Sequence, residues 1–297
     1  MKLEELAPKK GGNALKDAGV QRIKRADISS TIAYVAKITG IPKKDLHKIG
    51  STGKLPTSND IDLAVDSTLY DPDNIHGRIV AKIGDDRSVV NKGTKVSSYA
   101  IPIKGDESKG LVQVDLMYTP NTEWAKFSYH SAGENSKYKG AVRNRFLQGV
   151  AAAINEKGTD HFEYEEDGSL LIRAGRTLDL SAGLRRIFQH RPRRKDDAGY
   201  TKNLKSIPIE DFKTQFPDVE VRGGQITVDD PAKVVKVLFG AGVTPKDVET
   251  AEQVIHLIKK KFDLATQEKI FDFAKKRAKP LVGKMRLPKE LMDEDNG

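Results

Sequence analysis

Cysteine is absent from this chain of 297 residues, which excludes disulfide bonds, thiolate nucleophiles and zinc sites with cysteine ligands. The six histidines are scattered without the spacing of metal ligands, so any metal should be bound by carboxylates. No apolar run approaches the roughly eighteen residues of a membrane span, and the start of the chain lacks the apolar segment of a secretory signal. We therefore expect a cytoplasmic protein that has no membrane partner.

Acidic residues are outnumbered by basic ones, 42 against 51, which gives a net charge of +9. This balance favours a polyanionic partner such as nucleic acid, although many solvated surfaces are also basic. Hydrophobic residues make up 37% of the chain and charged residues 31%, as in a soluble globular protein. The length allows one large domain or two ordinary ones.

The stretch from Ile49 to Asp66 reads IGSTGKLPTSNDIDLAVD and contains two aspartates, Asp60 and Asp62, in a short apolar run. Side chains of a β-strand alternate between its faces, so these aspartates should share one face while the intervening apolar residues point into a core. Magnesium prefers oxygen ligands and keeps positions for water or a substrate phosphate. The pattern therefore predicts a metal site on a strand. We interpret Asp66, one repeat beyond the pair, as a strand-end residue.

A Gly-Ser turn, Gly50-Ser51, precedes this expected strand. Gly50 would let the backbone approach a phosphate, and Ser51 would add a hydroxyl and an N–H donor. The same dipeptide is also common in ordinary turns. A P-loop is not indicated, because Gly53-Lys54 is followed by Leu55 where that motif requires serine or threonine.

A third carboxylate, Asp115, lies in the run GLVQVDLMYT. Alternation places Val112, Val114 and Leu116 on the core face of this expected strand and Asp115 on the other face. A lone aspartate in such a strand is costly unless it is paired, hydrogen-bonded or bound to a metal. Taken singly, each of the three aspartates could be a turn or strand-edge residue. Together with Gly50-Ser51 they predict a metal site with three carboxylates.

The order of these motifs resembles the DNA polymerase beta nucleotidyltransferase superfamily, and in particular the palm of the family X polymerases. In that superfamily a Gly-Gly or Gly-Ser turn precedes a carboxylate pair and a distant third carboxylate. Here Ile49-Gly50-Ser51 is followed after eight residues by Asp60-Ile61-Asp62-Leu63, and later by Asp115. An aromatic helix, a turn at the nucleotide and an Asn/Arg-bearing helix come next in the family. Here Trp124, Phe127 and Tyr129 take the place of the aromatic helix, and residues 137–145 that of the last helix. Residues 130–133 take the place of the turn, with Ser-Ala-Gly where the family has Thr-Gly-Ser.

The resemblance implies an α/β (α+β) fold with a mixed β-sheet and a catalytic domain over residues 26–150. It also implies two Mg²⁺ ions, for which Mn²⁺ can substitute. Asp60 and Asp62 would bridge both ions, and Asp115 would complete the shell of one ion and help to deprotonate the attacking hydroxyl.

Further residues would contact the nucleotide if the resemblance holds. Gly50 and Ser51 would hold the β- and γ-phosphates of an NTP, and Ser131 would lie in the turn near the sugar and base. Cations at helical spacing near this site are candidates for phosphate contacts, or equally a solvated helix face. These cations are Lys137, Lys139 and Arg143.

The remaining segments are predicted in less detail. Residues 1–25 are expected to form an N-terminal extension, and residues 78–83 and 95–103 are expected to form further strands or a hairpin. Residues 151–297 are expected to form a mostly helical C-terminal domain with a hairpin around Asp167-Gly168. Capping and proline signals predict helices from Asp230 to Gly240, after Thr244, and from Thr266 to Lys279.

The C-terminal domain also contains a basic segment, residues 185–205, in which Phe188 and Tyr200 lie among the cations. Such a segment can neutralise phosphates and stack on bases, and it is a candidate nucleic-acid contact. It could equally be a flexible charged loop. The candidate binding residues are Arg191, Arg193, Arg194 and Lys195.

These features predict a metal-dependent nucleotidyltransferase that moves a nucleoside monophosphate from an NTP to an acceptor hydroxyl and releases pyrophosphate. The basic balance favours the 3′ end of a polynucleotide, RNA or DNA, as acceptor. A protein or small-molecule hydroxyl is an alternative acceptor. A nucleic-acid-binding protein on an inactive transferase scaffold is a further alternative, but such a scaffold would be expected to lose carboxylates, and all three are present.

Overall fold

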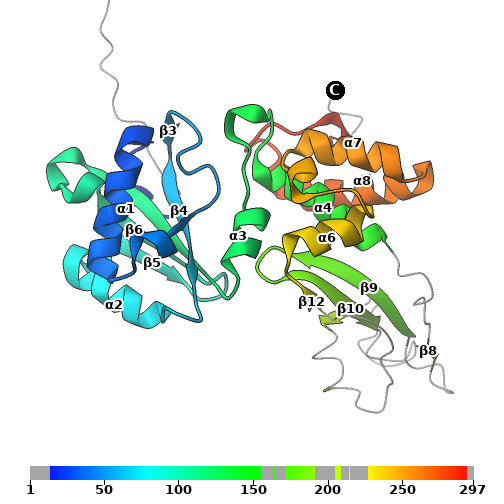
Figure 1. Cartoon of the computed structure of the whole chain (residues 1–297), viewed down its shortest axis with the longest axis horizontal. Coiled ribbons are helices and arrows are strands. Elements are labelled where there is room, and N and C mark those ends of the chain that lie inside the picture. Colours follow the sequence, from blue (N-terminus) through cyan, green and yellow to red (C-terminus); the bar gives the residue numbers. More distant parts are fainter. Residues whose placement is uncertain are drawn as a thin grey trace, which may run out of the picture. The chain divides into compact units, whose positions relative to one another are not determined.

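The computed structural model describes residues 14–154, 163–164, 171–190, 205–208, 214 and 227–292. Its helices and mixed sheet confirm the α+β fold class. The chain divides into two compact units, Met1–Lys137 and Tyr138–Gly297 (Figure 1). Helix α4 (Gly140–Ala153) packs on elements of the second unit. Residues 140–150, which we expected in the catalytic domain, therefore belong to the second unit.

The first unit is built on a five-stranded mixed sheet with the strand order β2-β4-β7-β6-β5. Strands β4 and β7 are parallel, and the other neighbouring pairs are antiparallel. The bounds are β2 (His47–Lys48), β4 (Asp60–Asp66), β5 (Ser88–Asn91), β6 (Val96–Pro102) and β7 (Leu111–Thr119), with β1 (Ile23–Lys24) and β3 (Thr57–Ser58) forming a separate small pair. The expected strands at 61–65, 95–103 and 111–119 are thereby confirmed.

Two helices, α1 (Arg25–Thr39) and α2 (Pro72–Ile83), cover one face of this sheet (Figure 1). Helix α1 buries its apolar residues at helical spacing and ends at Gly40, whose φ of 75° suits a left-handed cap. Helix α2 begins where the side chain of Asp71 accepts a hydrogen bond from the backbone N–H of Asn74.

The prediction of a strand at residues 78–83 was wrong, because these residues form the second half of α2. Ile75, Ile79 and Ile83 are all buried on one side of this helix. Their spacing of four residues is the helical period, and the Asp71-Pro72 start supplies the cap that identifies the helix.

The main core of the first unit lies between these helices and the sheet. Alternate residues of β4 and β7 point into it, as the sequence predicts. The core residues from these two strands are Ile61, Leu63, Val65, Val112, Val114, Leu116 and Tyr118. Their neighbours in the strands, including the three aspartates, therefore face the other side of the sheet.

Two smaller clusters pack on that other side. At one end, helix α3 (Thr122–Ser128) contributes Ala125, which packs with Ile49 and Ala64. At the other end, Leu15 and Val20 of the N-terminal segment pack against Ala100. Residues from about 14 onward thus belong to the first unit and are not an outlying extension.

The second unit combines helices with an antiparallel five-stranded sheet. Its further helices are α6 (Pro231–Phe239), α7 (Ala251–Lys261) and α8 (Leu264–Ala278), and its strands are β8 (Glu163–Tyr164), β9 (Leu171–Asp179), β10 (Gly183–His190), β11 (Lys205–Pro208) and β12 (Thr227–Val228). The antiparallel pairing of β8 with β9 agrees with the expected hairpin, and the turn expected at Asp167-Gly168 lies outside the described residues. The capping motif at Thr244 is also confirmed, although it begins a short 3₁₀ helix before α7 starts.

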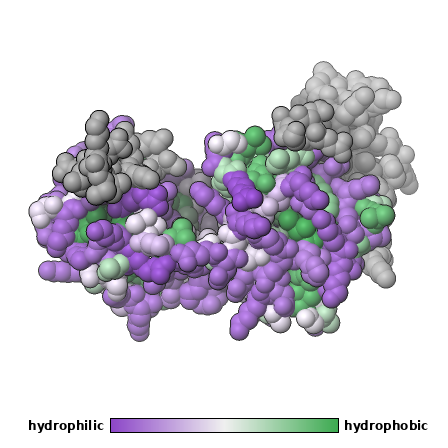
Figure 2. Space-filling view, turned by 90° about the horizontal axis from the view of Figure 1, so that it is seen from above, coloured by the Kyte–Doolittle hydropathy of each residue, from purple (hydrophilic) through white to green (hydrophobic). Residues whose placement is uncertain are grey.

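The surface is mainly polar on the face drawn in Figure 2, where hydrophilic residues cover most of the described part. Large exposed apolar side chains are few among the described residues: Leu69, Val89, Val90, Leu264, Val282 and Met292. Within the described ranges, no helix combines the length and the apolar character that a membrane crossing requires.

Candidate metal centre

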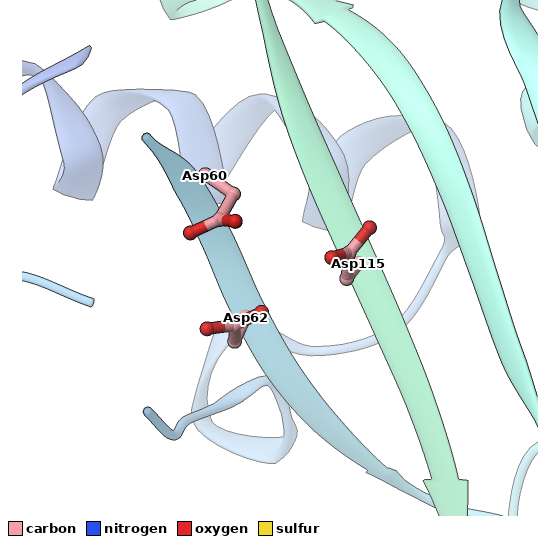
Figure 3. Close-up of side chains that lie close together, drawn as sticks. All are labelled: Asp60, Asp62 and Asp115. Carbon is pink, nitrogen blue, oxygen red and sulfur yellow. The ribbon is translucent and has the colours of Figure 1, made fainter. Parts of the chain in front are cut away.

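Three carboxylates meet on the face of the first unit's sheet that lies opposite the main core. Asp60 and Asp62 alternate with buried apolar residues along β4. Asp115 lies directly opposite Asp62 in the parallel pairing of β4 with β7. Each residue offers an oxygen that lies within 4.8 Å of those of the other two (Figure 3). This arrangement of oxygen donors could hold a metal ion.

The electrostatics of the cluster fit a cation. Burial, together with the negative charges of Asp60 and Asp115, raises the pKa of Asp62 to about 8. Burial also raises the pKa of Asp115, while hydrogen bonds from Ser98 and Gln113 oppose this rise. Neighbouring carboxylates in a partly buried site resist ionising together, and a divalent cation relieves that repulsion.

Asp115 is held in place by a side chain that the sequence analysis did not single out. Gln113 Nε2 donates to both oxygens of Asp115, at 2.9 and 3.0 Å. The side-chain oxygen Oε1 of Gln113 accepts hydrogen bonds from the backbone N–H groups of Ala14 and Leu15, at 3.1 and 3.3 Å. Gln113 thereby connects the N-terminal segment to the candidate metal ligand. Its position two residues before Asp115, on the same strand face, was a signal for this role.

The turn at Gly50 lies against Asp62. Gly50 has a φ of 60°, and a Cβ atom at this position would be 2.5 Å from Asp62 Oδ2. Backbone hydrogen bonds fix the turn, since Gly50 N donates to Tyr129 O at 3.0 Å and Ile49 N donates to Asp62 O at 3.1 Å. Both the conformation and the close approach therefore require glycine here.

Thr52 ties the same turn to β4, a role that the sequence analysis missed. Its buried hydroxyl accepts a hydrogen bond from the backbone N–H of Asp62 at 2.8 Å. Ser131 lies beside this loop, because Lys54 Nζ donates to Ser131 O at 2.5 Å and Gly50 forms a bridge with His130. Of the predicted nucleotide-binding residues, Gly50 lies against Asp62, Ser51 follows it in the same turn, and Ser131 lies beside the loop that continues from this turn.

Arg143 does not occupy the expected position. It is 1% exposed and lies in the second unit, where its Nε donates to Val248 O. Burial lowers the pKa of Arg143 to about 10. Helical spacing identified a common face in this helix but could not indicate that the face is turned inward. This guanidinium is buried inside the second unit, so the prediction of a phosphate contact was wrong.

The other predicted cations are placed as follows. Lys137 and Lys139 are exposed, at the end of the first unit and the start of the second. The basic segment begins within strand β10, so its first residues are not a loop. Arg191, Arg193, Arg194 and Lys195 lie outside the described residues.

No family model matches the chain, and no curated protein does. Its function is therefore inferred from the residues and geometry of this site.

Proposed function

We propose that this protein is a metal-dependent nucleotidyltransferase that moves a nucleoside monophosphate from an NTP to an acceptor hydroxyl and releases pyrophosphate. One observation carries the proposal. The carboxylate of Asp62, within a three-carboxylate cluster, lies against a glycine turn into which even a Cβ atom would not fit. A phosphate held at such a turn lies next to the site of a cation.

Asp60, Asp62 and Asp115 would hold two Mg²⁺ ions, for which Mn²⁺ can substitute. When bound, these ions stabilise negative charge on the attacking and leaving oxygens. In the transfer, the acceptor oxygen forms a bond to the α-phosphorus while the bond from that phosphorus to the bridging oxygen breaks. Pyrophosphate carries away the electron pair of the broken bond.

The hydroxyl proton would pass to a carboxylate oxygen of Asp115. Asp115 is a candidate for this role because its carboxylate lies directly opposite Asp62 in the pairing of β4 with β7. The two hydrogen bonds from Gln113 orient this carboxylate on its strand. Gln113 is thus a positioning residue.

The turn would hold the triphosphate mainly through Ser51. The backbone N–H of Gly50 already donates to Tyr129 O, so the contribution of Gly50 is the close approach that its missing side chain permits. The hydroxyl of Ser51, on the same turn, would donate to a phosphate oxygen.

The acceptor in this proposal is the 3′ hydroxyl of a polynucleotide, RNA or DNA. The net charge of +9 supports a polyanionic acceptor.

The test is incubation with each α-labelled ribo- and deoxyribonucleoside triphosphate, Mg²⁺ or Mn²⁺, and separate pools of RNA, DNA and protein. We expect metal-dependent label on a polynucleotide. Asp62→Asn should lower transfer by about 100-fold or more, because it removes a charged ligand. Label confined to the protein pool would show that the acceptor is a protein and not a polynucleotide. The absence of label in every pool would contradict the proposed enzymatic activity.

Asp66→Asn is the matched control. Asp66 lies at the end of the same strand, and its Oδ1 accepts hydrogen bonds from the backbone and hydroxyl of Thr68. The change from aspartate to asparagine is identical, but Asp66 is not part of the cluster. Transfer should therefore persist in this variant.

A further inference from the structure

Two arginines of the second unit lie near each other on the neighbouring helices α4 and α8 (Figure 1). These helices pack closely, since a Cβ atom at Gly149 of α4 would be 2.6 Å from the carbonyl oxygen of Ile270 on α8. Arg145 lies one turn before Gly149, and Arg277 lies two turns after Ile270. The two charges interact, because burial and then the positive charge of Arg277 lower the pKa of Arg145.

A neutral side chain orients each of these guanidinium groups. Arg145 Nη1 donates to Gln148 Oε1 at 3.0 Å, and Gln148 Nε2 donates in turn to Leu178 O at 3.2 Å. Arg277 Cζ lies 4.9 Å from the centroid of the Phe273 ring, which is the distance of a cation–π contact. These partners hold the two guanidinium groups without cancelling their charge.

The charge of this arginine pair is not balanced within the part of the chain that the structure describes. No carboxylate there forms an ion pair with Arg145 or Arg277. By contrast, Lys259 of the same unit pairs with Glu290 at 2.7 Å. Arg145 Nε is also buried without a hydrogen-bond acceptor among the described residues. An arginine that served packing alone would be expected to have its donors satisfied, so this arrangement favours an anionic ligand.

We propose that Arg145 and Arg277 together bind one phosphate group of a polynucleotide. A guanidinium group can donate two parallel hydrogen bonds to phosphate oxygens. A phosphate bound by both arginines would also replace their mutual repulsion by attraction.

The stripe of residues around Arg277 favours a polynucleotide over a small phosphate ligand. Lys269, Phe273 and Arg277 recur every four residues and therefore lie along one side of α8. Lys269 is exposed and lies about 12 Å from Arg277 along the helix axis. A single phosphate group does not span this distance, whereas the repeated charges of a polynucleotide backbone do. Inorganic phosphate or a mononucleotide offers the same chemistry at one point only.

This inference does not depend on nucleotidyl transfer, because binding can be measured with EDTA present. The full-length chain is titrated into a fluorescent single-stranded oligonucleotide at several salt concentrations. Arg145→Gln, Arg277→Gln and the double variant test the site. Arg87→Gln is the control, since it removes the same charge from the first unit, where Arg87 forms an ion pair with Glu107.

We expect each single replacement at the site to weaken oligonucleotide binding about tenfold. The double variant should bind little more weakly than either single variant, because both arginines hold the same phosphate. The slope of log K against log salt should fall by about 0.7, which corresponds to one phosphate contact on a single strand. The control should change both quantities less. Additive losses, a control with equal effects, or no binding of the oligonucleotide would overturn the proposal.

Inorganic phosphate and AMP, added as competitors at constant ionic strength, distinguish the source of the phosphate. Oligonucleotide binding that resists both competitors supports the polynucleotide backbone as the ligand. Displacement by either competitor that is lost in the double variant would assign the site to a small phosphate ligand and would overturn the proposed polynucleotide.

Thermal unfolding of Arg277→Gln separates a ligand role from a structural role. The melting temperature should change little, because the lost contact with Phe273 is offset by lower repulsion at Arg145. Affinity for the oligonucleotide should nevertheless fall. A lower melting temperature with unchanged affinity would show that Arg277 serves the fold and would contradict the proposal.

Discussion

At the scale of single residues, Asp62 connects the two parts of the candidate site. Its carboxylate belongs to the cluster of three aspartates and lies against Gly50. Its backbone N–H donates a hydrogen bond to the hydroxyl of Thr52, and its backbone carbonyl oxygen accepts one from the N–H of Ile49. A change in the turn should therefore move a candidate metal ligand directly.

Gly50→Ala tests this connection. The added methyl group would lie 2.5 Å from Asp62 Oδ2, so either the turn or the carboxylate must move. We expect metal affinity and the rate of transfer each to fall by about 10- to 100-fold, which is the usual order of magnitude when the orientation of a metal ligand is disturbed. Isothermal titration with Mn²⁺ and the labelled-NTP assay measure the two effects.

Gly53→Ala is the control for Gly50→Ala. Gly53 also has a positive φ, of 75°, but the nearest atom to its Cβ position is Lys48 Nζ at 3.9 Å. Both variants bear a similar backbone penalty of about 1 kcal/mol. Equal losses of metal affinity in the two variants would show that backbone strain, and not the contact with Asp62, causes the effect.

At the scale of elements, strand β7 connects the candidate metal ligand to the start of the chain. The side-chain nitrogen of Gln113 donates hydrogen bonds to Asp115. Its side-chain oxygen accepts hydrogen bonds from the backbone N–H groups of residues 14 and 15. The side chain is buried, at 3% exposure. The packing of the N-terminal segment on the sheet thus depends on the same residue that orients Asp115.

Gln113→Met should therefore affect both the cation and the N-terminal segment. Methionine has a similar length but donates no hydrogen bond, so Asp115 loses its orientation and its pKa rises further. We expect 10- to 100-fold weaker Mn²⁺ binding and faster amide exchange at residues 14 and 15. Titration calorimetry and hydrogen exchange are the measurements.

Gln148→Met provides the comparison for Gln113→Met. Gln148 is a buried glutamine of the second unit whose Nε2 donates to Leu178 O at 3.2 Å. This variant should lose stability of the same order, about 1–3 kcal/mol, with unchanged Mn²⁺ affinity. Weakened Mn²⁺ binding in both variants would point to a general effect on folding.

At the scale of the whole molecule, the carboxylate cluster makes the stability of the metal-free protein depend on pH. The pKa of Asp62 is about 8 in the folded protein, against about 3.9 in an unfolded chain. The folded state therefore binds more protons between these values. The contribution of this group to stability is complete below pH 4 and is lost as the pH rises towards 8.

Asp62→Asn should remove this dependence. In EDTA at pH 7.5 the variant should be more stable than the unaltered protein by on the order of 2 kcal/mol, and this advantage should shrink at pH 5. Mg²⁺ should stabilise the unaltered protein and have little effect on the variant. Urea unfolding at both pH values measures these differences, and an advantage independent of pH would contradict the assigned titration.

Asp66→Asn should behave in the opposite way. Hydrogen bonds from Thr68 lower the pKa of Asp66, so its charged form favours the folded state. Its replacement should lower stability at neutral pH and have less effect in acid.

The sequence by itself determined the strands that bear the three aspartates and the face on which these aspartates lie, although residues 78–83 were expected as a strand and form a helix. Alternation in the strands around Asp62 and Asp115 separates core residues from carboxylates, because strand geometry depends only on neighbouring residues. Asp230 and Gly240 bound α6 for the same local reason, through capping.

Only the tertiary structure decided which residues meet. The parallel register places Asp115 beside Asp62. The fold also brings Ala14 into contact with Gln113, which lies 99 residues further along the chain. The inward position of Arg143 likewise depends on a carbonyl 105 residues away. Local periodicity says which residues share a face, but it carries no information on the distant segment that packs against that face.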